Sequence, residues 1–326
     1  MNRGHARARA NIALVKYWGK RDPVRNLPAT GSLSLTLDGL STWTEVTFRG
    51  DLDEDRLSLD GVPARPEETA RVRRVLDEVR RMAGLGLFAQ VISRNDFPTG
   101  SGLASSASGM AALAVAAAAA ARLPPDLATW SMLARLGSGS APRSLLGGLV
   151  FLPAGAEPDG SDCVPSVLRD ESSIPWRMVL VLTDPGRKKV GSREGMERTR
   201  RTSPYYEAWI RRTGQDLILA REAARNLDLP ALGPVMEANA FAMHACAMAS
   251  SPPLIYWNGT TLEVIRQVRE LRREGLQGWL TMDAGPHVQV LCETRDAPSW
   301  AESLRSIPGV RSVRVEAPGS GPEVLP

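Results

Sequence analysis

Residues 97–122, FPTGSGLASSASGMAALAVAAAAAAR, decide more about this chain than any other stretch. A strand-like run at 87–93 leads into a loop rich in glycine and serine, and an alanine-rich run follows. Alanine has high helix propensity, so we expect a helix that begins directly after the loop. Such a loop directs several N–H groups at one point, where the helix dipole also favours negative charge. The stretch therefore predicts a phosphate-binding site.

Two widespread phosphate motifs do not account for this loop. No Lys-Ser or Lys-Thr pair follows the glycines, as the lysine-containing P-loop requires. The spacing Gly100-x-Gly102-x-x-Ser105 matches the dinucleotide fingerprint only in part. The pattern alone therefore leaves two interpretations open, an anion site and a Gly/Ser turn that caps a buried helix.

Length and composition are typical of a two-domain globular protein. The chain has 326 residues, of which 43% are hydrophobic and 23% charged. The net charge is only +4, and no block of like charge resembles a nucleic-acid-binding arm. The cysteines, at 163, 246 and 292, lack metal-ligand spacing and indicate reduced thiols. The N-terminus lacks the apolar core of a signal peptide, and the alanine run is poor in larger apolar residues. We expect a soluble, cytoplasmic protein.

The lysines are few and clustered. Of the 40 basic residues only Lys16, Lys20, Lys188 and Lys189 are lysines. A compact ammonium and a forked guanidinium are not interchangeable where a cation meets an oxygen. Chance placement is the alternative explanation, but two close pairs favour a function. We therefore treat both segments as candidate anion contacts.

The hydrophobic pattern predicts an irregular alternation of strands and helices. Strict alternation at 32–37 predicts a half-buried strand, and a second strand at 44–48 is expected after a turn at Asp38-Gly39. Helices are expected at 67–83, 104–120, 126–136, 203–225, 230–249 and 260–274, and further strands at 87–93, 149–152, 176–183, 278–282, 288–293 and 310–315. This order favours an α+β fold over a doubly wound sheet. The polar connection at 154–175 predicts two domains, at 1–173 and 174–326.

Two residues stand out as candidates for chemistry. Asp283 lies in the turn TMDAGP between two apolar strands, where a local Asx turn is the alternative to catalysis. Arg143 follows two serines in GSGSAPRS (residues 137–144) and has the geometry for a bidentate grip on a carboxylate or phosphate. A role in stabilising its own loop is the alternative for this arginine.

The remaining polar residues point to phosphoryl transfer. His5, His244 and His287 form no ligand cluster, and His244 is expected in the core. No serine nucleophile elbow or histidine-based triad is present. Anion-binding groups in separate segments, together with one well-placed carboxylate, suit a reaction in which the protein positions groups and neutralises charge.

Several motifs resemble one enzyme family. Residues 97–107, FPTGSGLASSA, resemble the phosphate-binding motif of the superfamily of galactokinase, homoserine kinase, mevalonate kinase and phosphomevalonate kinase. Within it, the chain resembles the diphosphomevalonate decarboxylases. The matching motifs occur in order at 11–21 (NIALVKYWGKR), 137–144 (GSGSAPRS), 192–196 (SREGM), 252–257 (PPLIYW) and 282–286 (MDAGP).

The resemblance implies a fold and an activity. It implies an N-terminal domain like ribosomal protein S5 domain 2, a ferredoxin-like C-terminal domain, an active site between them, and usually a homodimer. The implied activity is ATP- and Mg²⁺-dependent decarboxylation of mevalonate 5-diphosphate to isopentenyl diphosphate, a step of isoprenoid biosynthesis. The implied enzyme is an ATP-dependent carboxy-lyase.

The resemblance also implies roles for particular residues, although not the metal ligands. The reacting centre would hold Lys16, Arg143 and Asp283. The substrate diphosphate would contact Tyr17, Lys20, Ser138, Ser140, Lys188, Ser192 and Arg193. The nucleotide would contact Ser93, Asn95, Gly100, Ser101, Gly102, Ala104, Ser105 and Ser106.

The implied chemistry gives each reacting group a task. ATP would phosphorylate the 3-hydroxyl, which Asp283 would orient or deprotonate, with Lys16 favouring the ionised carboxylate. Arg143 would orient the substrate carboxylate. Relatives act on the monophosphate or only phosphorylate, but a retained Asp283 favours decarboxylation. Departures from the family pattern at 29–32, Pro142 and His287 concern details of substrate contact.

One alternative comes from a different class of protein. Because S5-like domains bind RNA, an arginine-rich RNA-binding protein is a second hypothesis. It predicts a continuous basic face and a steep dependence of binding on salt. The interspersed acidic residues argue against it.

Overall fold

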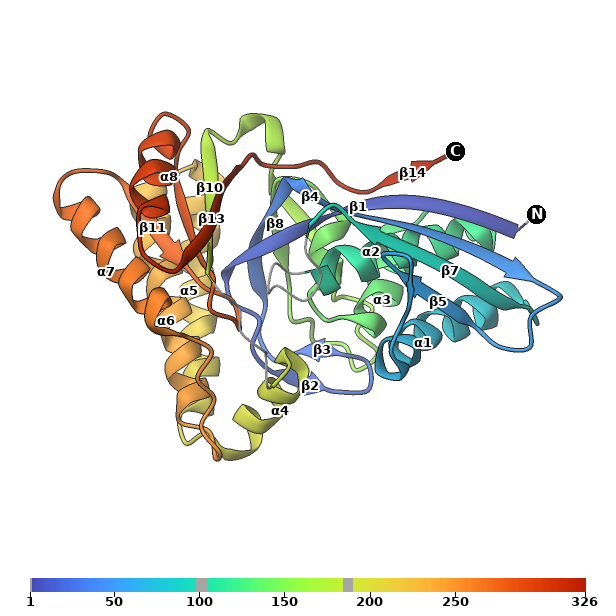
Figure 1. The fold of residues 1–326 in the computed structure, drawn as a ribbon. Coiled ribbons are helices and arrows are strands. Elements are labelled where there is room, and N and C mark those ends of the chain that lie inside the picture. Colours follow the sequence, from blue (N-terminus) through green and yellow to red (C-terminus); the bar gives the residue numbers. More distant parts are fainter. Residues whose placement is uncertain (1, 98–104, 184–189) are drawn as a thin grey trace.

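Two β-sheets hold the chain together, and the prediction of an α+β fold is confirmed. The structure, a computed structural model, describes residues 2–97, 105–183 and 190–326 (Figure 1). The first sheet follows the order β14-β1-β4-β7-β5-β6, with β8 joined to β4 and β9 joined to β8. The second sheet has the order β11-β12-β10-β13.

The strands of the first sheet are β1 (Asn2–Val15), β4 (Ser32–Arg49), β5 (Arg56–Leu59), β6 (Val62–Pro63), β7 (Phe88–Asn95), β8 (Leu149–Leu152), β9 (Ser166–Arg169) and β14 (Glu323–Leu325). Those of the second are β10 (Trp176–Thr183), β11 (Gly278–Thr281), β12 (Val288–Glu293) and β13 (Val310–Glu316). A small hairpin pairs β2 (Lys20–Asp22) with β3 (Leu27–Pro28).

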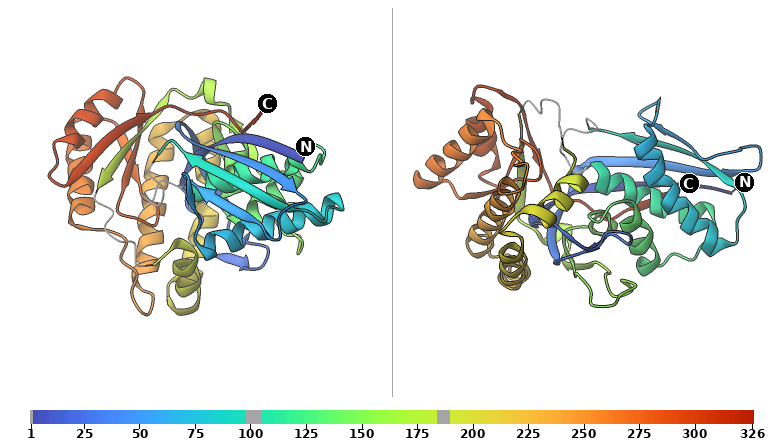
Figure 2. Two further views of the ribbon diagram at one scale, coloured as in Figure 1. Left: turned by 45° about the vertical axis from the view of Figure 1, so that its right-hand side comes forward. Right: turned by 90° about the horizontal axis from the view of Figure 1, so that it is seen from below.

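The helices of the first lobe are α1 (Pro66–Ala83), α2 (Ser105–Ala120) and α3 (Leu127–Gly137). Those that follow are α4 (Ser192–Thr202), α5 (Tyr206–Asn226), α6 (Leu229–Met248), α7 (Gly259–Arg273) and α8 (Ala297–Arg305). Helix α2 packs on β1 and β4, whereas α6, α7 and α8 pack on the second sheet. Helix α5 lies between α6 and the first sheet, and α4 packs on α6 (Figures 1 and 2).

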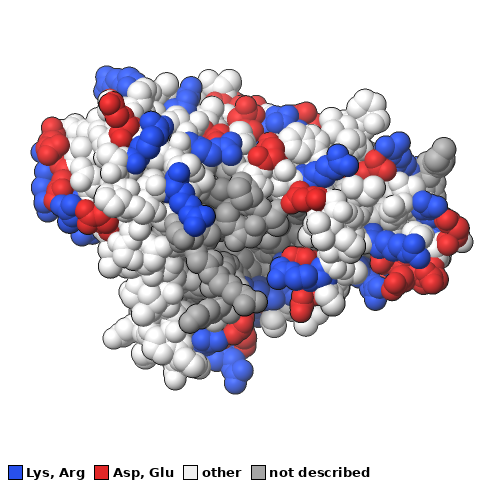
Figure 3. Space-filling model, in the orientation of Figure 1, with Lys and Arg blue, Asp and Glu red and all other residues white. Residues whose placement is uncertain are grey.

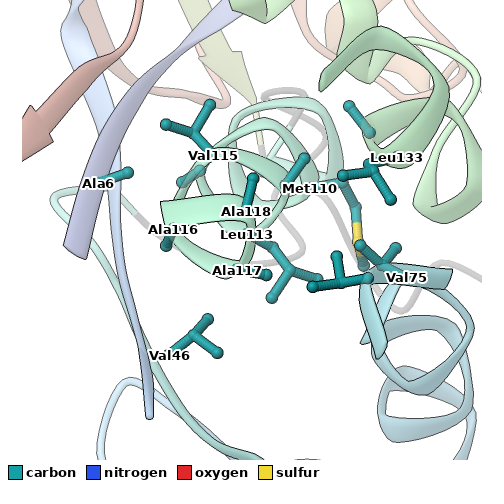
Figure 4. Close-up of a cluster of buried hydrophobic side chains, with 14 of the residues drawn as sticks. Ala6, Val46, Val75, Met110, Leu113, Val115, Ala116, Ala117, Ala118 and Leu133 are labelled. Carbon is teal, nitrogen blue, oxygen red and sulfur yellow. The ribbon is translucent and has the colours of Figure 1, made fainter. Parts of the chain in front are cut away.

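Helix α2 is the centre of the first lobe, as its alanine run predicts. Twelve of its 16 residues are buried, between the sheet on one side and α1 and α3 on the other (Figure 4). Small side chains let the helix lie close to β1. A Cβ atom added at Gly4 would stand only 2.6 Å from the Ala120 nitrogen and would also overlap the Ala116 carbonyl. This close packing holds the C-terminal half of α2 against β1.

The predicted turn at Asp38-Gly39 is wrong. Strand β4 runs without a break from residue 32 to 49, but its register with β1 shifts in the middle. The chain near the C-terminus pairs there instead, with a bridge from Leu37 to Pro318. A turn signal in the sequence therefore marks an irregularity in one long strand, which tertiary pairing keeps extended.

The C-terminal tail connects the two lobes. After β13 the chain crosses back to the first sheet, where β14 pairs with β1 (Figure 1). Arg9, which is buried, holds this tail through Glu323 at 2.9 Å and the Gly321 carbonyl at 3.0 Å. One apolar cluster also runs from β1 and β4 into β10, α5 and α6. The division at 173/174 stays a prediction.

The other expected elements are mostly found near their predicted bounds. Strands β8, β10 and β12 lie at the predicted residues. Helices α4 and α8, the long strand β1 and the short strands β2, β3, β5, β6, β9 and β14 were not predicted from the sequence. In the part of the chain that the structure describes, no helix is both long and apolar enough to cross a bilayer.

Candidate active site

A cavity of about 650 Å³ lies where segments of both lobes meet. Among the described residues, six lysine or arginine side chains and two carboxylates, those of Glu68 and Asp283, line it. The described residues predicted for catalysis and for substrate binding all line this one cavity: Lys16, Tyr17, Lys20, Ser138, Ser140, Arg143, Ser192, Arg193 and Asp283. A cavity with this excess of positive charge suits a polyanionic ligand.

Lys16 and Asp283 form the central ion pair. The Lys16 Nζ lies 2.7 Å from the Asp283 Oδ1 and also donates to the Ala13 carbonyl at 2.8 Å. Lys16 is only 1% exposed, and burial lowers its pKa, an effect that Asp283 opposes. An ammonium has three N–H donors, so one remains for a ligand. No donor among the described residues reaches the second carboxylate oxygen of Asp283, which lies on the cavity wall.

Arg143 is fixed by neutral partners. Its Nε donates to the Asn11 Oδ1 at 3.1 Å, and its Nη1 donates to the Ser32 Oγ at 2.7 Å. Asn11 in turn donates to the Ser144 Oγ at 2.7 Å. Burial lowers the pKa of Arg143 to about 10, which still leaves it charged at neutral pH. Its guanidinium therefore brings an uncompensated charge to the wall of the cavity.

A second group of cations lines the cavity away from this pair. The Lys20 Nζ donates to the Asn26 Oδ1 at 2.6 Å and makes no ion pair with the described residues. Partial burial and the charge of Arg193 lower the pKa of Lys20 to about 8. Desolvation and the nearby Arg74 and Arg71 likewise lower the pKa of Arg193. These mutually repelling cations would be stabilised by an anion.

Hydroxyl groups lie beside the cations. The Oγ atoms of Ser138 and Ser140 are 3.1 Å apart at the end of α3. The Tyr17 hydroxyl is buried without a hydrogen-bond partner among the described residues and lies over Gly139, where an added Cβ would approach it to 2.3 Å. A buried hydroxyl without a partner is costly, so a ligand that accepts its hydrogen bond would be stabilised.

The predicted phosphate loop is described only in part. Ser105 and Ser106 begin α2 and line the cavity. Gly100, Ser101, Gly102 and Ala104 lie outside the described residues, as does Lys188. The N–H groups of the first turn of α2 are suited to an anion in the cavity.

Ser93 and Asn95 line a different, smaller pocket. This pocket of about 110 Å³ shares Glu68, Arg71, Ser105 and Ser106 with the main cavity, and apolar side chains form part of its wall. The Ser93 Oγ lies 2.9 Å from the Thr44 Oγ1. Neither Ser93 nor Asn95 lines the main cavity.

Two amide side chains that hold the cations were not predicted from the sequence. Asn26 accepts from Lys20 while donating to the carbonyls of Arg135 and Leu136, each at 2.9 Å. Asn239, on α6, accepts from the Lys16 backbone N–H at 2.8 Å. Asn26 adopts the left-handed conformation, which asparagine tolerates better than most residues, but this conformation is not visible in the sequence.

His244 occupies a structural position. His244 is buried in α6, and its ring lies 4.7 Å from that of Trp257. Burial, together with the charge of Lys16, lowers the pKa of His244 to about 3 and keeps the ring neutral. Among the described residues no group of three or more His, Cys, Asp or Glu side chains could hold a metal ion.

The face of the molecule in Figure 3 gives no support to the RNA-binding hypothesis. On the face in Figure 3, acidic and basic side chains alternate over both lobes, with no continuous basic stripe. The cations that line the cavity are the exception, and they converge from several elements on one site.

The two-lobed fold, with the N-terminus of α2 beside a cation-lined cavity, is that of the galactokinase, homoserine kinase, mevalonate kinase and phosphomevalonate kinase superfamily. Mevalonate diphosphate decarboxylase from Staphylococcus aureus is 36% identical to this chain, with a TM-score of 0.93 over 99% of this chain and 98% of that one. A structure described as MDDEF in complex with MVAPP, AMPPCP and magnesium is 38% identical, with the same TM-score and coverage.

Sequence comparison identifies the family. Residues 8–165 match the diphosphomevalonate decarboxylase-like N-terminal domain, and residues 178–317 match the mevalonate 5-diphosphate decarboxylase C-terminal domain. Diphosphomevalonate decarboxylase of Eremothecium gossypii is 38% identical over 304 residues, 86% of this chain and 75% of the relative. That of Bos taurus is 37% identical over 309 residues, 87% of this chain and 75% of the relative. The chain belongs to the diphosphomevalonate decarboxylase family.

Proposed function

We propose that this protein decarboxylates mevalonate 5-diphosphate to isopentenyl diphosphate at the expense of ATP, as a step of isoprenoid biosynthesis. The observation that carries the proposal is the Lys16–Asp283 pair on the wall of a cation-lined cavity, in a chain of this family. The chemistry needs one carboxylate at an alcohol and several cations around phosphate and carboxylate groups. The cavity has that composition.

At the reacting centre we assign three groups. The free oxygen of Asp283 orients the 3-hydroxyl and accepts its proton as the hydroxyl attacks the γ-phosphorus of ATP. Lys16 holds that carboxylate through an ion pair of 2.7 Å, and its remaining N–H reaches the transferred phosphate. Arg143 orients the substrate carboxylate. A very tight ion pair between Arg143 and the substrate carboxylate in the ground state would oppose loss of CO₂. Because buried, uncharged groups hold Arg143, we assign it to orienting the carboxylate and not to binding it strongly.

We assign the substrate diphosphate to the second group of cations and hydroxyls. Tyr17, Lys20, Ser138, Ser140, Ser192 and Arg193 are its proposed contacts, together with Lys188. Among the described residues, Lys20 and Arg193 make no ion pair, which leaves their charge for the ligand. After phosphate leaves C3 with its bonding electrons, the carboxylate releases CO₂ and its electron pair forms the alkene.

We place the ATP phosphates at the start of α2 and the base in the adjoining smaller pocket. Ser105 and Ser106 border both spaces, and Ser93 and Asn95 lie on the base side. Gly100, Ser101, Gly102 and Ala104 complete the proposed phosphate loop. Mg²⁺, present in the related complex with AMPPCP, neutralises charge on phosphate oxygens in reactions of this kind.

We also propose a cytoplasmic homodimer with domains at 1–173 and 174–326. Free cysteines at all three positions support a reducing compartment. Ile218 and Leu219 on α5 are 71% and 59% exposed, and such adjacent apolar side chains favour a partner surface. Light scattering during size-exclusion chromatography would test the dimer, and a mass near 35.2 kDa would contradict it.

The substrate is tested by supplying Mg-ATP with mevalonate, its 5-phosphate or its 5-diphosphate and measuring ADP and CO₂ separately. We expect equal amounts of ADP and CO₂, with the diphosphate as the preferred substrate. ADP without CO₂ would indicate a 3-kinase. Turnover with the monophosphate alone would indicate a phosphomevalonate decarboxylase.

A further inference from the structure

A chain of buried hydrogen bonds leads to Lys16 from the side opposite the cavity. Lys16 is the first residue after β1, so its backbone N–H has no strand partner. Asn239 supplies the acceptor, with its Oδ1 at 2.8 Å, and is fully buried in the middle of α6. Its Nδ2 donates to the Asp216 Oδ2 on α5 at 2.9 Å. The Asp216 carboxylate is 5% exposed and also accepts from the Arg212 Nε at 2.8 Å.

This series of hydrogen bonds fixes which atom of the Asn239 amide accepts and which donates. The Lys16 N–H can only donate, so the oxygen of Asn239 must face it. The Asn239 amide therefore presents its NH₂ group to α5, where an acceptor is needed. The Asp216 Oδ2, at 2.9 Å, is the nearer acceptor, and the Thr213 Oγ1 lies 3.5 Å from the same nitrogen. The charge of Asp216 is balanced by Arg212, which is half exposed.

The opposite end of Lys16 is held just as closely. The Lys16 Nζ donates to the Ala13 carbonyl and to Asp283, and Thr281 also donates to the Ala13 carbonyl at 3.3 Å. The register of β1 shifts between Ala13 and Val15, and such bulges redirect a side chain beside an active site. With the main chain of Lys16 anchored on α6, the ammonium reaches Asp283 from a fixed origin.

We infer that Asn239, supported by Asp216, is a positioning residue that holds Lys16 in line with Asp283. The inference rests on the proposed role of Lys16 in catalysis. Neither Asn239 nor Asp216 lines the cavity, so both act through Lys16 and not on the substrate. The charged and titratable groups that act on Lys16 in the wild type are Asp283, Arg143 and the neutral His244, and no variant below replaces them. Asn239→Asp adds a carboxylate beside Lys16, and Asp216→Asn removes one from α5.

The polarity of the chain suggests a suppressor experiment. Asn239→Asp keeps an acceptor for Lys16 but places a second carboxylate against Asp216. We expect kcat to fall about 30- to 100-fold. Asp216→Asn alone should stay within about threefold of wild type, because its amide oxygen can face Asn239 while Arg212 turns to water. The double variant restores a donor–acceptor pair and should recover kcat to within about threefold.

Matched controls separate positioning from folding. Asp228→Asn, at the N-cap of the same helix α6, should neither reduce kcat nor rescue Asn239→Asp. Asn239→Leu removes the acceptor, and Asp216→Asn should not rescue it. The nucleotide Kd should be unchanged in each soluble variant. If Asp216→Asn fails to rescue Asn239→Asp, or Asp228→Asn rescues it equally, the inference is wrong.

Lys16 itself offers a readout that does not need turnover. With only four lysines in the chain, ¹⁵N-lysine labelling gives a side-chain NMR spectrum of at most four ammonium signals. In Asn239→Leu, which removes the acceptor without adding a charge, the Lys16 signal should shift and titrate at lower pH, because a looser contact with Asp283 no longer raises its pKa. Asp228→Asn should leave the signal unchanged. An unchanged Lys16 titration in Asn239→Leu would contradict the inference, whereas a wild-type enzyme without decarboxylase activity would contradict only the proposed function.

Discussion

The two ends of the cavity carry positive charge in different ways. At the reacting end, Lys16 is paired with Asp283, and amide and hydroxyl oxygens support Arg143 before any ligand arrives. At the other end, which we propose for the substrate diphosphate and call the diphosphate end, Lys20 and Arg193 face other cations and make no ion pair among the described residues. The first group is therefore arranged to hold its side chains in a fixed geometry, and the second to attract an anionic ligand. We therefore expect variants at the first end to change kcat and those at the second to change KM.

The largest effect is expected at Asp283. Asp283→Asn removes the proton acceptor and should lower kcat by at least about 10³-fold, with nucleotide and substrate Kd nearly unchanged. ADP and CO₂ release, with a fluorescence titration of nucleotide, would check both parts. Asp296→Asn, at the start of α8, is the matched control and should be neutral. Near-normal turnover of Asp283→Asn would remove the carboxylate from the mechanism.

Arg143 tests whether fixed geometry matters more than charge. Arg143→Lys keeps the positive charge but cannot reach both Asn11 and Ser32, so it leaves the Asn11 amide oxygen or the Ser32 hydroxyl without its donor. The loss of at least one charge-assisted bond of this kind predicts about a 10²-fold fall in kcat. The exposed Arg211→Lys serves as control. A change in KM alone would place Arg143 with the cations of the diphosphate end.

Arg193 tests the other half of the comparison. Arg193→Gln removes one unpaired cation, so KM for the diphosphate should rise about 10- to 100-fold while kcat changes less than about threefold. Raising the salt concentration should weaken wild-type binding more than binding by the variant. Steady-state kinetics at two salt concentrations would show this. A loss confined to kcat would contradict the division of the cavity into two ends.

The smallest effect is a dependence on pH at Lys20. Its pKa is lowered to about 8, so the ammonium loses its proton as pH rises through that value. Because the diphosphate binds the charged form, affinity should be greatest below pH 8 and should fall about threefold from pH 7.5 to 8.5. Lys20→Arg should remove this fall, since arginine stays protonated there. Equal pH dependence in both enzymes, measured by calorimetry, would assign the effect to another group.

Local sequence determined the helix-forming core and the motifs of the site. The alanine run of α2 forms a helix because alanine has the highest propensity, and its small side chains allow it to lie against β1. Strands β8, β10 and β12 are apolar enough to be bounded from sequence. The motifs at 11–21, 137–144, 192–196 and 282–286 marked described residues that line the cavity, although the pattern alone left an Asx turn open for Asp283.

Only the tertiary structure decided how those segments meet. Strand β1 was missed because its first half alternates alanine with arginine, both good helix formers, and it becomes a strand through pairing with β4 and β14. Asp283 lies 267 residues from Lys16 in sequence, and their contact depends on both sheets being in place. Asn239 and Asp216 carry no motif at all. Their function follows from facing a backbone N–H at the end of β1, and a hydrogen bond between distant elements leaves no pattern in a single sequence.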